Sequence, residues 1–177
     1  MKKTIKISAG SLYILSIDRI KPKGNVPKTK VKAVDLETRL LDEMKKYFGK
    51  DVRRIKHAEN VLTYAKKIMK KEGGSAQVVI ASAILHDIGI KNCELKYGAS
   101  DGQLQEKEGP PIAKKILKDL RFDKNDITEI CSMIASHHSP GEIDTLNFRI
   151  LWDADWLVNL KDECDTINKA KISKIVQ

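Results

Sequence analysis

Residues 83–89, Ala-Ile-Leu-His-Asp-Ile-Gly, close the most apolar stretch of the sequence and decide the fold. The stretch from residue 77 to about residue 87 is apolar on nearly every side, which predicts a buried central helix. Neighbouring residues inside a helix point about 100° apart, so His86 and Asp87 would not share a target there. At the carboxyl end of a helix the second residue can swing back, and Gly89 permits the left-handed turn this needs. We therefore expect His86 and Asp87 to face one site.

A helical periodicity surrounds this central stretch. From residue 35 onward apolar residues recur about every 3.6 positions, which predicts an all-α bundle of six or seven helices. Residues 89–109 have the composition of a polar loop. Pro110 suits the first position of the next helix, where the missing N–H does no harm. The expected helices cover residues 35–48, 51–72, 77–87, 110–120, 123–138, 144–160 and about 167–175.

The composition is that of a globular chain. The 177 residues are enough for one domain, at about 100–200 residues per domain. No apolar stretch reaches the roughly 18 residues of a membrane span, and the amino terminus lacks the apolar segment of a signal peptide. Cys93, Cys131 and Cys164 are odd in number and far apart, which is typical of reduced thiols. We therefore expect a cytoplasmic protein without a membrane span.

The net charge of +9 is concentrated at the amino terminus. Residues 1–32 carry nine Lys or Arg and one Asp, which leaves the rest of the chain nearly neutral. We expect residues 1–31 to form a basic arm, in which a weak alternation indicates a small β-hairpin, and residues 32–177 to form the domain. Such an arm can contact nucleic-acid phosphates or a membrane surface, but a solvated tail is the more common role.

All four histidines of the chain stand on or beside apolar stripes of the expected helices. Burying an imidazole or a carboxylate without a partner costs several kcal/mol, so each needs compensation. Taken singly, a hydrogen-bonded core histidine or a helix-end cap explains each residue. Taken together, one metal ion would compensate several of them. The residues concerned are His57, His86, His137, His138, Asp87 and Asp155.

The arrangement resembles the HD-domain metal-dependent phosphohydrolases. That family places a histidine on one helix, His-Asp at the end of a later helix and an aspartate further along. In this chain the matching residues are His57, His86, Asp87 and Asp155. The resemblance covers about residues 35–165 and implies an HD-type helical bundle with these four residues as metal ligands.

The choice of the last aspartate comes from the resemblance alone. Residues 153–160, Asp-Ala-Asp-Trp-Leu-Val-Asn-Leu, look like a helix of the family and select Asp155, whereas periodicity leaves Asp153 equally open. Trp152 and Trp156 lie one turn apart in the same segment. They are candidates for a base-stacking wall, although core packing is the more common role.

The resemblance implies hydrolysis of a phosphate ester. Two imidazoles and two carboxylates suit a divalent Mn, Fe, Co, Ni, Zn or Mg ion, which would activate a water. Asp87 would orient or deprotonate that water. Lys91 is a candidate catalytic and phosphate-binding residue, and Arg54 and Lys115 are weaker phosphate-binding candidates. We expect a small phosphorylated substrate, a phosphomonoester or phosphodiester with nucleotides included. A non-catalytic module that binds a metal ion or a nucleotide is the alternative.

The sequence also leaves open whether a second metal ion binds. Binuclear members of the family add histidines, and His137-His138 resemble that addition. Gln105 stands where the family has another added histidine, and Glu108 follows one turn later. A second ion would then be held by Glu108, His137 and His138. The alternative is that the two histidines cap the carboxyl end of a helix.

Overall fold

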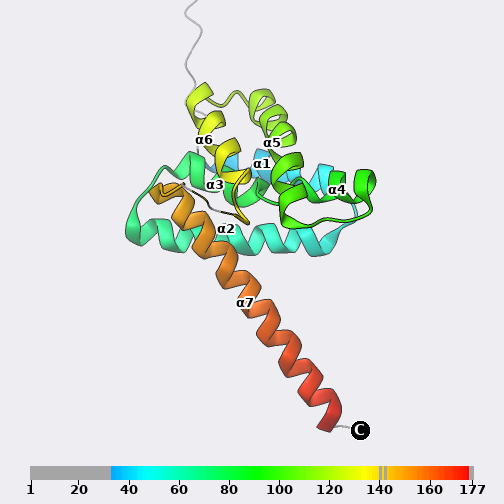
Figure 1. The fold of residues 1–177 in the computed structure, drawn as a ribbon. Helices are drawn as coiled ribbons and strands as arrows, with labels where there is room; N and C mark the ends of the chain where they lie inside the picture. The colour runs from blue at the N-terminus through cyan, green and yellow to red at the C-terminus, as the bar shows by residue number, and fades with distance from the viewer. Residues whose placement is uncertain (1–32, 140, 142, 176–177) are drawn as a thin grey trace, which may run out of the picture. The chain divides into compact units, whose positions relative to one another are not determined.

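The computed structural model describes residues 33–139, 141 and 143–175, with side chains described within residues 35–166. Within these ranges the chain forms α-helices and no strand, so the expected all-α bundle is confirmed (Figure 1). The basic arm and its β-hairpin, expected in residues 1–31, lie outside the described residues. The helices are α1 (Ala33–Phe48), α2 (Val52–Glu72), α3 (Ala76–Leu85), α4 (Ile90–Tyr97), α5 (Gly102–Asp119), α6 (Lys124–Ile134) and α7 (Leu146–Ile175).

The central helix is α3, as the sequence predicts. Seven of its ten residues are buried, and Val79, Ala83 and Leu85 are completely covered. It packs against α1, α2, α6 and α7. Because these helices surround α3, His86 at its carboxyl end lies in the interior of the bundle.

Local signals in the sequence fix several helix ends. Asp51 begins α2 by accepting a hydrogen bond from the Arg54 backbone N–H at 3.2 Å. The end of α2 is Gly73, whose φ of +88° places it in the region that favours glycine. Asp123 begins α6 in the same way as Asp51, accepting from the Asn125 N–H at 2.8 Å. These ends place His57 early in α2 and His137 just beyond α6.

The expectation of a polar loop over residues 89–109 is wrong. This stretch contains α4 and the first part of α5, and Pro110 lies inside α5 rather than at its first position. The true start of α5 is set by Asp101, whose carboxylate accepts from the Leu104 N–H at 3.0 Å. Proline usually breaks a helix interior, so Pro110 predicts a helix start at residue 110, whereas the cap at Asp101 is a single side chain and gives a weaker pattern in the sequence.

The expected helices at 144–160 and 167–175 are one continuous helix, α7. The residues between them include no Gly or Pro that would end a helix. Lys161 and Asp165, one turn apart, form an ion pair at 2.6 Å across the supposed break. The expected count of six or seven helices holds because this merger offsets the extra helix α4.

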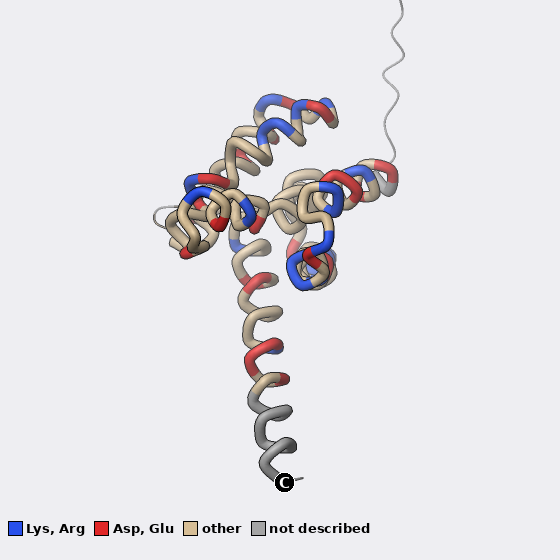
Figure 2. The backbone as a smooth tube through the Cα atoms, turned by 90° about the vertical axis from the view of Figure 1, so that its right-hand side faces the viewer, with Lys and Arg blue, Asp and Glu red and all other residues tan. Residues whose placement is uncertain are grey.

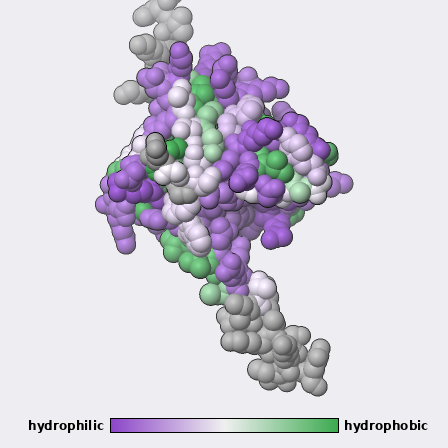
Figure 3. All heavy atoms as spheres, in the orientation of Figure 1, coloured by the Kyte–Doolittle hydropathy of each residue, from purple (hydrophilic) through white to green (hydrophobic). Residues whose placement is uncertain are grey.

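Hydrophilic residues cover most of the face of the molecule seen in Figure 3. The apolar interior includes Leu40, Met44, Leu85, Ile134 and Leu151, each at most 1% exposed. None of the described helices has both the length and the apolar character that a membrane crossing requires. The polar residues that remain inside this core are therefore the informative ones.

Candidate metal centre

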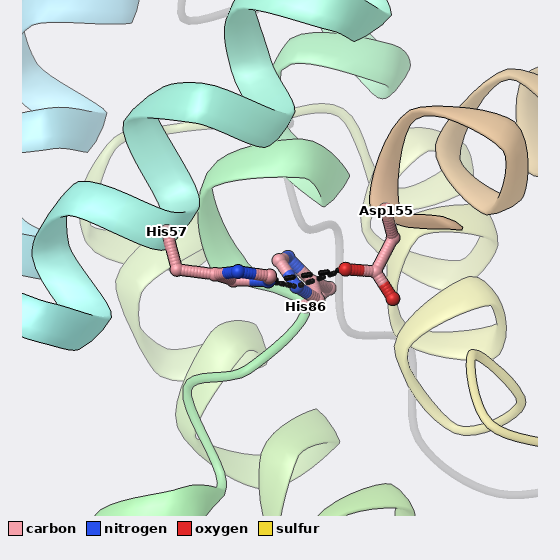
Figure 4. Close-up of side chains that lie close together, drawn as sticks. All are labelled: His57, His86 and Asp155. Atoms are coloured by element: carbon pink, nitrogen blue, oxygen red, sulfur yellow. Dashed lines mark hydrogen bonds and ion pairs between the residues drawn. The ribbon is translucent and has the colours of Figure 1, made fainter. Parts of the chain in front are cut away.

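Three helices bring His57, His86 and Asp155 together (Figure 4). The Nε2 atoms of His57 on α2 and His86 after α3 are 3.2 Å apart. The Oδ1 atom of Asp155 on α7 lies 3.0 Å from the first and 3.6 Å from the second. Asp155 thus lies within this cluster, whereas Asp153 is exposed.

Asp87 joins this group from the turn between α3 and α4. Its Oδ2 atom lies 3.5 Å from His86 Nε2 and 3.6 Å from His57 Nε2. Its other oxygen, Oδ1, lies 3.4 Å from Nε2 of His137. The two oxygens of Asp87 therefore face two different sets of histidines.

Gly89 allows this turn for a different reason from the one expected. Its φ of −71° is helical, so the predicted left-handed turn is wrong. A Cβ atom at this position would instead lie 2.6 Å from the carbonyl oxygen of Gln105 and 2.7 Å from the nitrogen of Gly109. Glycine is required because the backbone of α5 passes against the turn that carries His86 and Asp87.

The histidines His86 and His137 present the same nitrogen to the site. Nδ1 of His86 lies 3.0 Å from the Ala83 carbonyl oxygen, and Nδ1 of His137 lies 2.8 Å from the Ile134 carbonyl oxygen. Because a carbonyl only accepts hydrogen bonds, Nδ1 carries the proton in each ring. Nε2 is then left with a free lone pair in the neutral ring, which is the state of a metal-ligating histidine.

A second group of ligand-type atoms consists of Asp87, His137 and His138, all within 4.8 Å of one another. Gln105 orients His138: its Nε2 donates to the Ser100 carbonyl at 2.7 Å, so its Oε1 faces Nε2 of His138 at 3.1 Å and accepts from it. The lone pair of the neutral His138 ring is therefore on Nδ1.

Glu108, expected to belong to this second group, lies elsewhere. Its carboxylate accepts hydrogen bonds from Lys96 at 2.6 Å, Tyr97 at 2.9 Å and Asn92 at 3.3 Å, all on α4. The neighbouring Glu106 is the one that reaches the second group. It accepts from the backbone N–H of His138 at 2.9 Å and of Ser139 at 2.8 Å, and from the Ser139 hydroxyl.

The ionisable groups of the cluster shift one another's pKa values. Burial lowers the pKa of His86, which keeps its ring neutral. Burial acts in the same direction on His57 and His137, but the nearby carboxylates outweigh it and raise both pKa values. Burial raises the pKa of Asp87, yet the surrounding histidines outweigh it and hold the pKa well below its ordinary value. Burial also raises the pKa of Asp155, but its hydrogen bond with His57 outweighs burial and lowers that pKa.

These residues fit a divalent metal ion. Nε2 of His137 is buried and makes no well-formed hydrogen bond within the described residues, and the Asp87 oxygen nearest to it lies 3.4 Å away. Atoms of His57, His86 and Asp155 that can each offer a lone pair converge from three helices. Such atoms repel one another at this distance unless a cation between them accepts their lone pairs. Imidazole and carboxylate ligands without a thiolate suit Mn, Fe, Co, Ni, Zn or Mg.

A cleft of about 730 Å³ opens beside the cluster. Of the expected phosphate-binding residues, only Arg54 lines it, and Arg54 is paired with Asp51 and Glu94. The Lys91 ammonium instead donates to the Tyr47 carbonyl at 2.7 Å. Neither Lys91 nor Lys115 is among the described residues that line the cleft, so the roles expected for them are not supported by their positions.

Several lining residues were missed by the sequence reasoning. Arg53 lies one turn before His57 on α2, and Asn159, Asp162 and Glu163 follow Asp155 on one face of α7. The helical spacing from His57 and Asp155 is the signal that predicts them. By contrast, Trp152 and Trp156 are not among the described lining residues, and Trp152 makes tilted ring contacts with Phe148 and Trp156.

Comparison with known proteins gives consistent results. Residues 54–160 match the family model of the HD domain. The crystal structure of a predicted HD superfamily hydrolase from an uncultured Thermotogales bacterium is similar, at 30% identity and a TM-score of 0.56. That match covers 68% of this chain and 66% of the other, so this chain spans just under two thirds of that protein's length. The comparison with curated proteins found no match.

The matched range includes every residue of the two ligand groups, from His57 on α2 to Asp155 on α7. It also covers more than half of the chain. With the geometry and the match in agreement, the chain belongs to the HD-domain family.

Proposed function

We propose that the protein is a metal-dependent hydrolase that cleaves a phosphate ester, either a monoester or a diester, by direct attack of water on phosphorus. The observation that carries this proposal is the meeting of His57, His86 and Asp155 from separate helices beside an open cleft. The similar Thermotogales protein is described as a predicted hydrolase, which supports hydrolysis as the reaction class.

His57, His86, Asp87 and Asp155 would hold a divalent ion, which supplies a Lewis acid that acidifies a water and offsets phosphoryl charge. Asp87 stays ionised at neutral pH because its pKa is lowered. Its carboxylate is therefore charged and able to accept a hydrogen bond from the attacking water, which orients that water. The water oxygen forms the new bond to phosphorus as the ester P–O bond breaks, and the alcohol leaves with a proton.

The second group would hold a further ion through Asp87, His137 and His138. The buried Nε2 of His137, which makes no well-formed hydrogen bond and faces Oδ1 of Asp87 at 3.4 Å, supports this assignment. Glu108, part of the set expected from the sequence, is left out because its carboxylate is bound to α4. Asp87 would then belong to both groups, since its two oxygens face them separately.

The test compares the wild type with His86→Ala and Asp87→Ala. Each protein is stripped with a chelator, reloaded with each divalent ion in turn and offered a panel of phosphate esters. Phosphate release, metal content by elemental analysis and helical content by circular dichroism are measured. We expect both variants to lose metal and activity while keeping most of their helical content.

Asp153→Asn is the matched control, because Asp153 is an exposed carboxylate two residues from Asp155. It should keep metal and activity. Full metal occupancy in both His86→Ala and Asp87→Ala would contradict the ligand assignment. If the wild type binds metal but hydrolyses none of the esters, the result would instead favour the alternative of a non-catalytic module that binds a metal ion or a nucleotide.

A further inference from the structure

The second half of α7 extends beyond the bundle. In its first half Ala154 and Val158 are completely covered. From residue 159 to residue 166, by contrast, every described side chain is exposed. Figures 1 and 2 both show the described part of α7 running away from the other helices. Helices in proteins are stabilised mostly by the packing of one face rather than by propensity alone, so this segment calls for a partner.

An apolar surface lies where α7 leaves the bundle. Trp156, Leu157 and Leu160 are 51%, 43% and 48% exposed, and they are three of the six exposed large hydrophobic residues among the described ones. They follow one another at helical spacing, so they share one side of α7. We call these three residues the outer face of α7. Trp156 also contacts the ring of Trp152, which continues inward to the buried Phe148.

The outer face is separate from the cleft beside the metal centre. The α7 residues beyond Asp155 that line the cleft are Asn159, Asp162, Glu163 and Thr166, and none of the three residues of the outer face is among the described lining residues. Tryptophan is enriched among the residues that dominate binding between proteins. The outer face is therefore a candidate protein interface that leaves the cleft open.

The charge along α7 changes sign from its middle to its end. Residues 156–165 include three acidic residues and one lysine, whereas residues 166–175 include three lysines and no acidic residue. Two such helices side by side in the same direction would place like charges together. In opposite directions, the acidic part of each helix meets the basic part of the other, which favours antiparallel pairing.

The charge pattern also distinguishes between two candidate partners within the sequence. Residues 1–32 carry nine Lys or Arg and one Asp, so they would suit residues 156–165 but would be repelled by the lysines of residues 166–175. A second copy of α7 complements both parts at once. It also brings its own Trp156, Leu157 and Leu160 to cover apolar surface.

We propose that the outer face of α7 binds a second copy of the chain, with the two α7 helices antiparallel. The same surface then serves both copies, as in a closed two-fold dimer. Because the bundle is attached to the first half of α7, antiparallel helices place the two bundles at opposite ends of the pair. The pairing needs no ligand at the metal centre, so it is independent of the function proposed above.

The experiment measures the self-association of the full chain by sedimentation equilibrium, at concentrations from about 1 to 100 µM. The wild type should form a dimer. A variant carrying both Trp156→Ala and Leu160→Ala should associate roughly a hundredfold more weakly, because interface tryptophans contribute strongly and both copies lose theirs. Alanine keeps the helix propensity, and circular dichroism should show an unchanged helical content.

The matched control carries both Val52→Ala and Leu95→Ala. These residues are 73% and 77% exposed and lie on α2 and α4, so the control also removes two exposed apolar side chains. It should associate as the wild type does. A monomeric wild type would overturn the proposal, and so would equal association of the wild type and the Trp156→Ala, Leu160→Ala variant.

A second variant tests the direction of pairing. Lys169→Glu, Lys171→Glu and Lys174→Glu together remove the basic part of α7, so an antiparallel pair would bring acidic residues against acidic residues. We expect a dimer at least about tenfold weaker than that of the wild type, since several like charges then meet at the interface. An unchanged dimer affinity in this variant would overturn the antiparallel arrangement.

Discussion

At the scale of single residues, the hydrogen bonds that finish two helices also prepare the site. The last carbonyl groups of a helix have no partner within it. Those of Ala83 and Ile134 accept from the Nδ1–H groups of His86 and His137. One bond therefore satisfies a helix end and aims Nε2 of the same ring at the cluster.

Proton release should accompany metal binding. Nearby carboxylates raise the pKa values of His57 and His137 in the metal-free protein against the opposing effect of burial, so both rings keep their protons to a higher pH than a free imidazole. A ligating imidazole must give up its proton, so the metal affinity should rise with pH until both rings are neutral. Calorimetry in buffers of different ionisation enthalpy measures the protons released. A metal affinity that stays constant as the pH rises from mildly acidic to mildly alkaline would contradict the assignment of these rings as ligands.

Gly89→Ala should disrupt the turn that carries His86 and Asp87. The added Cβ would lie 2.6 Å from a backbone oxygen and 2.7 Å from a backbone nitrogen of α5, neither of which is a flexible side chain. We expect a loss of about 1–3 kcal/mol in the free energy of unfolding, together with weaker metal binding. Urea unfolding and elemental analysis measure the two effects.

The control for this substitution is Gly49→Ala. Gly49 has a φ of +65° but nothing within 4 Å of an added Cβ atom. It should cost only the strain of a left-handed residue, about 1 kcal/mol, and leave metal content unchanged. Equal loss of metal in both variants would show that the packing at Gly89 does not position the site.

At the scale of elements, α5 organises two neighbours through two glutamates that lie two residues apart. Glu106 accepts hydrogen bonds from the turn that follows α6, and Glu108 accepts hydrogen bonds from α4. The first interaction positions His138, whereas the second holds α4 beside the cleft. On α5, Glu106 therefore supports the second ligand group, whereas Glu108 stabilises the packing of α4.

Glu106→Ala should weaken binding at the second ligand group and spare the first. Its loss frees the backbone of His138 and Ser139, while His57, His86 and Asp155 keep their contacts. A metal titration followed by elemental analysis should show loss of the weaker-bound ion alone. Glu108→Gln is the control and should leave the metal content unchanged. Loss of both ions in Glu106→Ala would show that the two groups are not independent.

At the scale of the whole molecule, the bundle holds a cluster of ionisable side chains within its apolar core. The metal ion would bind the folded chain and not the unfolded one, so it should add to stability. Calorimetric scans with and without a chelator should show a lower Tm for the metal-free protein. A free ion concentration of 100 times Kd would contribute about 2.7 kcal/mol. An unchanged Tm would contradict metal binding by the folded core.

The metal-free protein should also lose stability in acid. The pKa values of Asp87 and Asp155 are lower in the folded chain than the ordinary value of about 3.9. Their ionised forms therefore stabilise the fold above about pH 4, and this contribution is lost as the pH falls through the folded pKa values. Urea unfolding between neutral and acidic pH measures the loss. Asp155→Asn should show a shallower dependence on pH than the wild type.

The sequence by itself determined the helical class, the buried central helix and the ligand candidates. Periodicity and capping residues such as Asp51 and Asp123 are local signals, and a polar residue such as His57 on an apolar stripe is visible without coordinates. The resemblance to the HD motif selected Asp155 over Asp153, a choice that periodicity left open.

Only the tertiary structure decided which polar side chains meet. Glu106 and Glu108 differ by two positions on one helix and bind different elements, and Lys91 turns to the backbone of α1 rather than to the cleft. The reason for Gly89 is likewise a close approach of α5, which lies later in the chain. Contacts between distant segments depend on how helices pack, and the pattern along one helix does not specify its neighbour.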